Sequence, residues 1–166
     1  MVGFVLSLVL ALTSHSGAGQ ARATNFPIRG VVVPGKTIGG VGIGLTEKAV
    51  RARWGRNYTL CKSCSLPTWL YEYQGGEPLG AAVKFRNDRV VAVFTLGSPA
   101  GWGLKGVMMG DPVSNVYALF PNTGDANCIG YNALTVRLDG DTTSFYSASG
   151  VIYGYALTAR SQPPCQ

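Results

Sequence analysis

The sequence predicts an α+β fold of two tandem repeats, each a short helix followed by an antiparallel sheet of three or four strands. With 166 residues, 46% hydrophobic and 13% charged, the composition suits one compact domain or two closely packed repeats. The 23 glycines and 9 prolines favour turns and short strands over long helices. Finally, one apolar pattern occurs twice, because Gly44 and Gly110 are separated by the same number of residues as Val50 and Val116.

Residues 1–23 are expected to be a signal peptide. The uncharged apolar run at 2–13 is too short to span a bilayer comfortably, and Ala21-Arg22-Ala23 has the A-x-A form of a cleavage site. The mature chain would begin at Thr24, with an N-terminal extension over 24–37. We therefore expect a secreted, extracellular or cell-envelope protein with no stable membrane insertion after cleavage.

Removal of this segment changes the available chemistry. The single histidine, His15, would leave with it, which excludes Ser-His-Asp and Cys-His nucleophilic sites and His-ligated zinc from the mature chain. The formal net charge of +6 falls by one through the loss of Arg22. This modest positive charge is compatible with an anionic cell-wall polymer, whereas export and the modest charge argue against nucleic acid.

The first repeat is expected over residues 38–96. Thr46 is a good N-cap, Glu47 suits the positive end of a helix, and Gly55 can end it, which predicts a helix over 47–54. Strands are predicted over 68–73, 81–85 and 89–96, with a hairpin turn at 86–88.

An aromatic stripe lies on the first of these strands. Alternation places Trp69, Tyr71 and Tyr73 on one face. This face is either packed against the helix as core or exposed as a binding surface, since tyrosine and tryptophan are enriched in binding hot spots. Alternation alone leaves both possibilities open.

Residues 97–106 are expected to be a linker, in which Trp102 either fills the seam between the repeats or forms an exposed contact. The second repeat spans 107–157 and opens with Asp111 as N-cap and Pro112 at the first helical position, followed by apolar residues at helical spacing to Phe120. Strands are predicted over 133–138, 142–146 and 151–157, and a C-terminal tail over 158–166.

The four cysteines are expected to form two disulfides. Four cysteines allow three pairings, of which we favour Cys61–Cys64 and Cys128–Cys165, the latter tethering the tail. The C-x-x-C spacing of the first pair also occurs in thiol–disulfide oxidoreductases, with Lys62 able to lower a thiol pKa. That chemistry requires the first cysteine at a helix N-terminus after a strand, whereas this segment is expected to follow a helix and to precede Pro67 and a strand. A zinc site would require a second closely spaced pair.

The repeat pattern resembles two known families, the secreted β-lactamase inhibitor proteins and the BamE (SmpA/OmlA)-like envelope domains, as well as exported proteins of an actinobacterial type. The resemblance rests on short segments: Ile43-Gly44-Leu45-Thr46, Val50, Trp54-Gly55, Trp69-Leu70-Tyr71-Glu72-Tyr73 and Val83-Lys84-Phe85-Arg86-Asn87-Asp88-Arg89-Val90. It implies a non-enzymatic protein that acts through its surface. The lipidated cysteine of BamE-like proteins and the enzyme-contacting loops of the inhibitors are not recognisable in this sequence.

We therefore expect an exported, non-enzymatic protein-binding module, such as an inhibitor or an envelope assembly factor, whose partner is another exported or envelope protein. The candidate contact residues are Trp69, Tyr71, Tyr73, Arg86, Arg89 and Trp102. The alternatives are a cell-wall or carbohydrate-binding module and, less favoured, an oxidoreductase using Cys61 and Cys64. The close carboxylates Asp139 and Asp141 fit a solvated turn better than a catalytic pair. No catalytic residue, metal site or cofactor is predicted.

Overall fold

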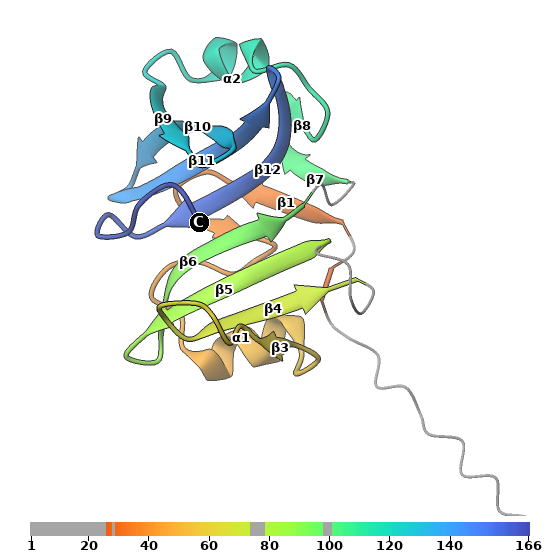
Figure 1. The fold of residues 1–166 in the computed structure, drawn as a ribbon, viewed down its shortest axis with the longest axis vertical. Helices are drawn as coiled ribbons and strands as arrows, with labels where there is room; N and C mark the ends of the chain where they lie inside the picture. The colour runs from red at the N-terminus through yellow and green to blue at the C-terminus, as the bar shows by residue number, and fades with distance from the viewer. Residues whose placement is uncertain (1–25, 28, 74–78, 98–100) are drawn as a thin grey trace, which may run out of the picture.

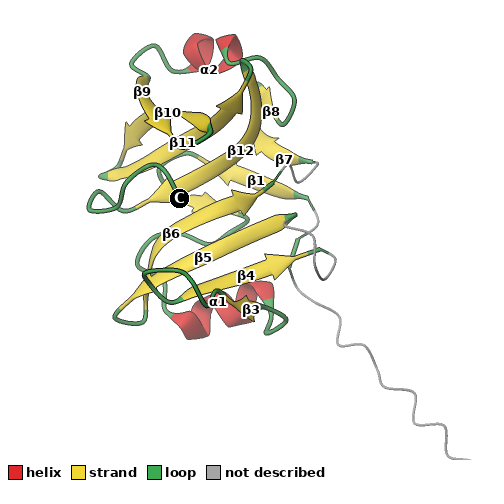
Figure 2. Ribbon diagram, in the orientation of Figure 1, coloured by secondary structure: helices red, strands yellow, loops and turns green. Residues whose placement is uncertain are grey.

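The computed structural model describes residues 26–27, 29–73, 79–97 and 101–166. The expected signal peptide over 1–23, with His15 and the expected mature start at Thr24, lies outside these residues. The described part of the chain forms twelve strands and two helices, and the strands are arranged in two sheets (Figure 2).

The larger sheet has eight strands, and all neighbouring strands in it are antiparallel. Their spatial order is β3 (Thr59–Leu60), β4 (Thr68–Glu72), β5 (Gly80–Arg86), β6 (Arg89–Leu96), β12 (Val151–Thr158), β11 (Asp141–Ala148), β10 (Tyr131–Leu138) and β9 (Gly124–Cys128). Strands β6 and β12 pair at the centre through Phe94 opposite Ala156. Beyond this ladder, the Thr95 hydroxyl accepts a hydrogen bond from the Tyr155 N–H at 2.8 Å.

The smaller sheet has four short strands and lies behind the large one in Figure 1. Its order is β2 (Thr37–Ile38), β1 (Gly30–Val33), β7 (Trp102–Leu104) and β8 (Val107–Met108). Strands β1 and β7 are parallel, and the other two pairs are antiparallel. The turn between β1 and β2 is attached to the large sheet, because the Gly35 N–H donates to the Thr143 hydroxyl of β11 at 2.8 Å.

The expected fold class, α+β with two helix-plus-small-sheet repeats, is therefore wrong. Most of the described residues with regular structure are in strands, and the two predicted meanders join edge to edge in one large sheet. The physical reason is that β6 and β12 would each leave a row of unpaired backbone groups at a sheet edge, and their pairing removes both edges. In addition, the segments expected to be an extension and a linker contribute β1 and β7 to the second sheet.

Helix α1 (Glu47–Trp54) has the bounds that its capping residues predict. The Thr46 hydroxyl accepts a hydrogen bond from the Ala49 N–H at 3.2 Å. Gly55 ends the helix with a φ of +81°, a conformation that side chains with a Cβ rarely adopt. Val50 and Trp54 are buried and fix the helix against the sheet.

Helix α2 (Ser114–Leu119) is shorter than predicted and begins later. The Asp111 carboxylate accepts from the Met108 N–H at 2.8 Å instead of capping a helix. Moreover, the Asp111 carbonyl accepts from the Ile152 N–H, and Pro112 forms a bridge with Val151. Because these backbone groups already pair with β12, the helix cannot begin at Pro112.

The hairpin turns follow their sequence signals. Asn87 and Asp88 both have positive φ between the paired ends of β5 and β6, and Asp139 and Gly140 have the same sign between β10 and β11. Two consecutive residues with positive φ are typical of type I′ turns, which match the twist of a hairpin. Asp139 is thus a turn residue, as the sequence indicates.

Each face of the large sheet is covered differently. The face toward α1 and the small sheet carries the main core, which includes Trp54, Tyr71, Trp102, Phe145 and Tyr155. On the opposite face, a smaller cluster around Tyr146 packs under the C-terminal tail, whose end lies in front of β6 and β12 in Figure 1.

Candidate functional site

The aromatic stripe on β4 belongs to the core. Trp69 is 3% exposed and Tyr71 is 0% exposed. The Trp69 ring stacks on Tyr58 with centroids 4.1 Å apart and contacts Phe85 at 4.5 Å. Of the two alternatives left open by the sequence, packing against the helix is the one found, so Trp69 and Tyr71 are not available to a partner.

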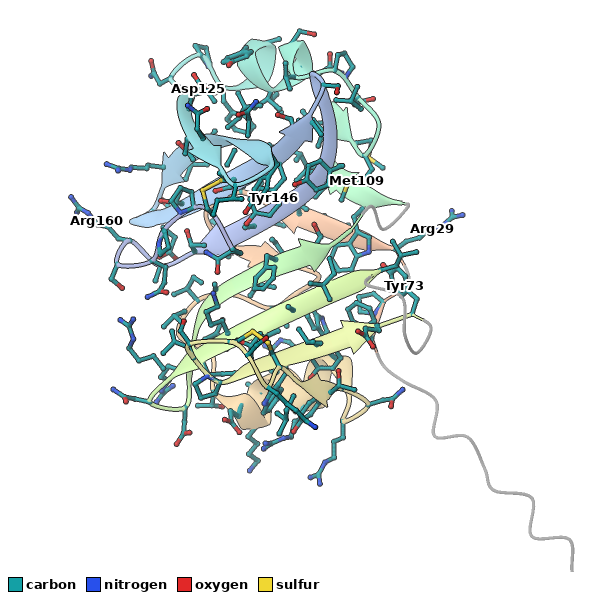
Figure 3. All side chains as sticks on the ribbon, viewed as in Figure 1. Arg29, Tyr73, Met109, Asp125, Tyr146 and Arg160 are labelled. Carbon is teal, nitrogen blue, oxygen red and sulfur yellow. A yellow bond between two sulfur atoms is a disulfide. The ribbon has the colours of Figure 1, made fainter. Side chains whose placement is uncertain are left out.

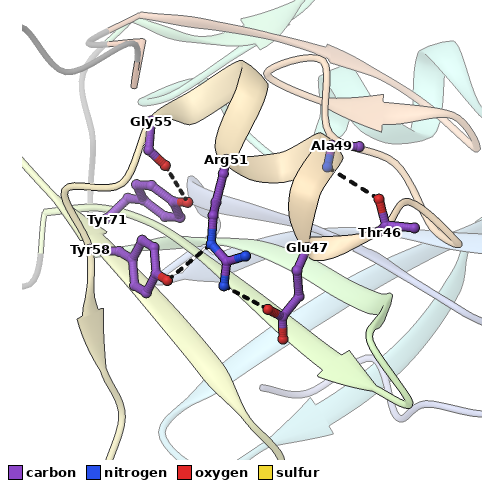
Figure 4. Close-up of polar contacts among 7 residues, drawn as sticks. All are labelled: Thr46, Glu47, Ala49, Arg51, Gly55, Tyr58 and Tyr71. Carbon is purple, nitrogen blue, oxygen red and sulfur yellow. Dashed lines mark hydrogen bonds and ion pairs between the residues drawn. The ribbon is translucent and has the colours of Figure 1, made fainter.

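A polar network around α1 holds this stripe in place (Figure 4). Arg51 forms an ion pair with Glu47 at 2.7 Å, its Nε donates to the Tyr58 hydroxyl at 3.3 Å, and its guanidinium lies 4.5 Å from the Trp69 ring centroid. The Tyr71 hydroxyl donates to the Gly55 carbonyl at 3.3 Å, and burial raises the pKa of Tyr71 well above its usual value. The network therefore joins the end of the helix to the sheet and serves a structural role.

Trp102 fills the space between the two sheets. It is fully buried, its ring lies 6.4 Å from Trp54 in an edge-to-face arrangement, and its Nε1 donates to the Tyr73 hydroxyl. A Cβ on Gly30 would lie 2.3 Å from the Trp102 ring, so the indole requires glycine on the neighbouring strand. Burial raises the pKa of Tyr73, which is only partly exposed.

The two predicted arginines are exposed at the β5–β6 hairpin. Arg86 and Arg89 are directly opposite each other in the strand register. Like charges at such positions repel. The Arg89 guanidinium donates to the Gly44 carbonyl at 3.2 Å, and the ion pair found within the described residues involves neither arginine. The structure thus brings these two predicted contact residues together at the hairpin, and they remain separate from the buried aromatic residues.

Both favoured disulfides are present, Cys61–Cys64 and Cys128–Cys165. Cys61 follows β3 and precedes β4 rather than opening a helix. The helix N-terminus that lowers a thiol pKa in C-x-x-C oxidoreductases is therefore missing from this described segment. Among the described residues, no group of three or more histidine, cysteine or acidic side chains is placed to hold a metal ion.

The second disulfide anchors an exposed apolar residue. Ile129 is fully exposed at the turn between β9 and β10, next to Cys128. The disulfide joins this turn to Cys165 of the tail, and the Tyr131 and Tyr146 hydroxyls donate to carbonyls of the same tail at 3.1 and 3.0 Å. Ile129 is consequently presented on a turn that is fixed from both sides.

A recess of 240 Å³ lies between α2 and the end of the large sheet near β9. It is lined by Val113, Tyr117, Asp125, Asn127, Asn132, Leu134, Ser147 and Gly150. Figure 3 labels Asp125, which lies on β9 beside α2. Two amides, a hydroxyl and a carboxylate thus meet two aliphatic side chains and a tyrosine in a small open space.

One wall of this recess is a hydrogen-bonded pair. The Tyr117 hydroxyl donates to Asp125 Oδ1 at 3.0 Å. This hydrogen bond raises the pKa of Tyr117, because the protonated phenol is the donor. The Tyr117 phenol therefore stays protonated near neutral pH and keeps donating to Asp125.

The fold defines a mostly antiparallel β protein with two stacked sheets. No family model matches the chain, and no curated protein matches it. A solved structure resembles it: the 1.5 Å crystal structure of an extracellular protein containing an SCP domain from Bacillus anthracis str. Ames. The two structures superpose with a TM-score of 0.53 and share 11% sequence identity. The match covers 70% of this chain and 44% of that protein. At this identity the likeness shows the fold alone.

Sequence reasoning missed both the recess and Ile129. The alternation of Asp125 and Asn127 next to Cys128 is a strand signal, and Cys128-Ile129-Gly130-Tyr131 contains the glycine of a turn. The predicted strand began only at residue 133, so these residues were placed in no element. Within the described residues, no helix is long and apolar enough to cross a membrane.

Proposed function

We propose that the chain is an exported, non-enzymatic protein-binding module that contacts its partner through hairpin ends rather than through the aromatic stripe. The observation that supports this most strongly is Ile129, a large aliphatic side chain held fully in solvent by a disulfide-anchored turn. Single exposed apolar residues are common on protein surfaces. Ile129 differs because the fixed turn loses little conformational entropy when a partner covers it.

Export is supported by three features. The predicted signal peptide, the two disulfides and the extracellular location stated for the structural neighbour agree with an oxidising compartment outside the cytoplasm. The proposed partner is therefore another exported or envelope protein.

The test places a photoreactive residue at position 129 or, as a control, at Lys48, which is exposed on α1. Irradiation of the secreting cells should give a discrete cross-linked species from position 129 and none from position 48. Excess wild-type protein should compete for the partner and reduce the yield of this cross-linked species, whereas excess Ile129→Asp protein should leave the yield unchanged. Equal cross-linking at both positions, or equal competition by Ile129→Asp with an unchanged Tm, would contradict the proposal.

A second candidate function is binding to an anionic wall polymer, and the arginine pair at the β5–β6 hairpin favours it. Arg86 and Arg89 repel each other across the hairpin, and a polyanion would relieve that repulsion. Wild-type protein should sediment with insoluble cell wall at low salt and much less at high salt. The double variant Arg86→Gln/Arg89→Gln should sediment less, whereas Arg53→Gln on α1 should behave as wild type.

A further inference from the structure

The recess beside α2 contains polar side chains that the fold itself does not use. Asn127, Asn132 and Ser147 line it, and within the described part of the chain none of their side chains forms a hydrogen bond. In contrast, the Tyr117 hydroxyl in the same recess donates a hydrogen bond to Asp125. Asn127 and Asn132 are exposed, so their amides are hydrated and can exchange water for a ligand in this space, whereas Ser147 is buried at its base.

The strand register explains how these side chains come together. Asn127 of β9 is opposite Asn132 of β10, which is opposite Ser147 of β11. They form one cross-strand row on the face that carries the main core. The next row contains Asp125, Leu134 and Phe145, of which Leu134 and Phe145 are buried in the core and Asp125 is exposed. The core thus ends at Leu134 and Phe145, and the recess begins at the neighbouring row of Asn127, Asn132 and Ser147.

We propose that this recess binds a single neutral pyranose ring of a saccharide. The two amides offer both donors and acceptors, which vicinal hydroxyls need, and the Asp125 carboxylate accepts from a further hydroxyl. Val113, which is partly exposed, supplies an apolar wall for the C–H groups of the ring. The volume of 240 Å³ lies below the range of sites for drug-sized ligands, so the occupant is a single ring.

The lining residues also favour a neutral sugar over charged ligands. It contains no lysine or arginine, so a phosphate or other anion would meet the Asp125 carboxylate without a compensating cation. An ammonium group would be attracted to Asp125 but has no acceptor for the amide N–H groups of Asn127 and Asn132. A neutral polyol uses both kinds of group.

The test follows the side-chain amide signals of Asn127 and Asn132 in ¹⁵N-labelled protein during titration with glucose, methyl galactoside or N-acetylglucosamine. We expect saturable shifts for at least one sugar, with a Kd on the order of 1 mM, as for a ligand of about a dozen heavy atoms. Asn132→Ala should weaken binding at least about tenfold, since one bidentate polar contact is lost. Asn57→Ala, an exposed asparagine outside the recess, should leave binding unchanged.

The same titration distinguishes the alternatives. Absence of saturable shifts with all three sugars, or equal binding by Asn132→Ala, would overturn the proposal. Tighter binding of butylammonium than of any sugar at the same amide signals would also overturn it, because the recess would then be a cation site. Ile129 takes no part in this measurement, so its outcome is independent of the protein-binding proposal.

Discussion

The adjacent residues Ser144 and Thr143 on β11 allow a test in which one substitution stabilises the protein and its neighbour destabilises it. Both are fully buried, and alternation directs them to opposite faces of the large sheet. The Ser144 hydroxyl has no hydrogen-bond partner among the described residues. The Thr143 hydroxyl accepts from the Gly35 N–H at 2.8 Å and attaches the small sheet to β11.

The expected free energies follow from these different surroundings. Ser144→Ala removes a buried polar group that has lost its water without gaining a partner, so we expect the free energy of unfolding to rise by about 1–2 kcal/mol. Thr143→Val keeps the shape but leaves the buried Gly35 N–H without an acceptor. We expect a loss of about 1–3 kcal/mol for this variant.

Urea unfolding of the disulfide-intact protein, followed by tryptophan fluorescence, measures both effects. The transition midpoint should shift to higher urea for Ser144→Ala and to lower urea for Thr143→Val, with equal slopes. In a thermal scan, each kcal/mol corresponds to about 2–4 °C in Tm for a chain of this size. A decrease in stability for Ser144→Ala would refute the reasoning, since it would show that the hydroxyl has a partner in solution.

Three further predictions concern the cross-links, the buried phenols and the packing between the sheets. In unfolding experiments, Cys165→Ser should lower stability by about 4 kcal/mol and Cys61→Ser by about 2 kcal/mol, because the bridges close sequence separations of 37 and 3 residues; equal losses would contradict the loop-entropy argument. Burial raises the pKa of Tyr146 in the folded state. The free energy of unfolding should therefore stay constant up to pH ~10, where the phenol of the unfolded chain ionises, and decrease above it. In unfolding curves measured at alkaline pH, Tyr146→Phe should make this decrease smaller. Trp102→Ala should cost about 3–5 kcal/mol by calorimetry, because it empties the space between the sheets, and a loss below about 1 kcal/mol would show that the sheets pack without it.

Local signals in the sequence predicted local structure well. Helix α1 begins after Thr46 and ends before Gly55 because the cap and the glycine act within a few residues of the helix. The β5–β6 hairpin forms where Asn87 and Asp88 can adopt positive φ. Both features depend on contacts that are close in sequence, which residue patterns describe directly.

The overall architecture depends on contacts that such patterns do not describe. Strands β1 and β7 are parallel neighbours although about 70 residues separate Gly30 from Trp102 in the chain. Each has four residues or fewer, so neither shows a full period of alternation. The pairing of β6 with β12 likewise joins two meanders that appear complete in sequence, which is why separate sheets were predicted.

The burial of the aromatic stripe could not be predicted for a related reason. Alternation shows that Trp69 and Tyr71 share a face, but it carries no information about what covers that face. Here α1 covers it, and the largest aromatic side chains stabilise the core instead of binding a partner. Among the exposed apolar residues of the described chain, Leu60, at 64% exposure, precedes the disulfide cysteine Cys61, and the fully exposed Ile129 follows the disulfide cysteine Cys128. A disulfide fixes a turn without requiring its neighbours to be buried, and so permits an aliphatic residue to remain in solvent. In this chain, Ile129 beside its bridged cysteine is therefore a better candidate for a contact surface than the buried aromatic stripe of β4.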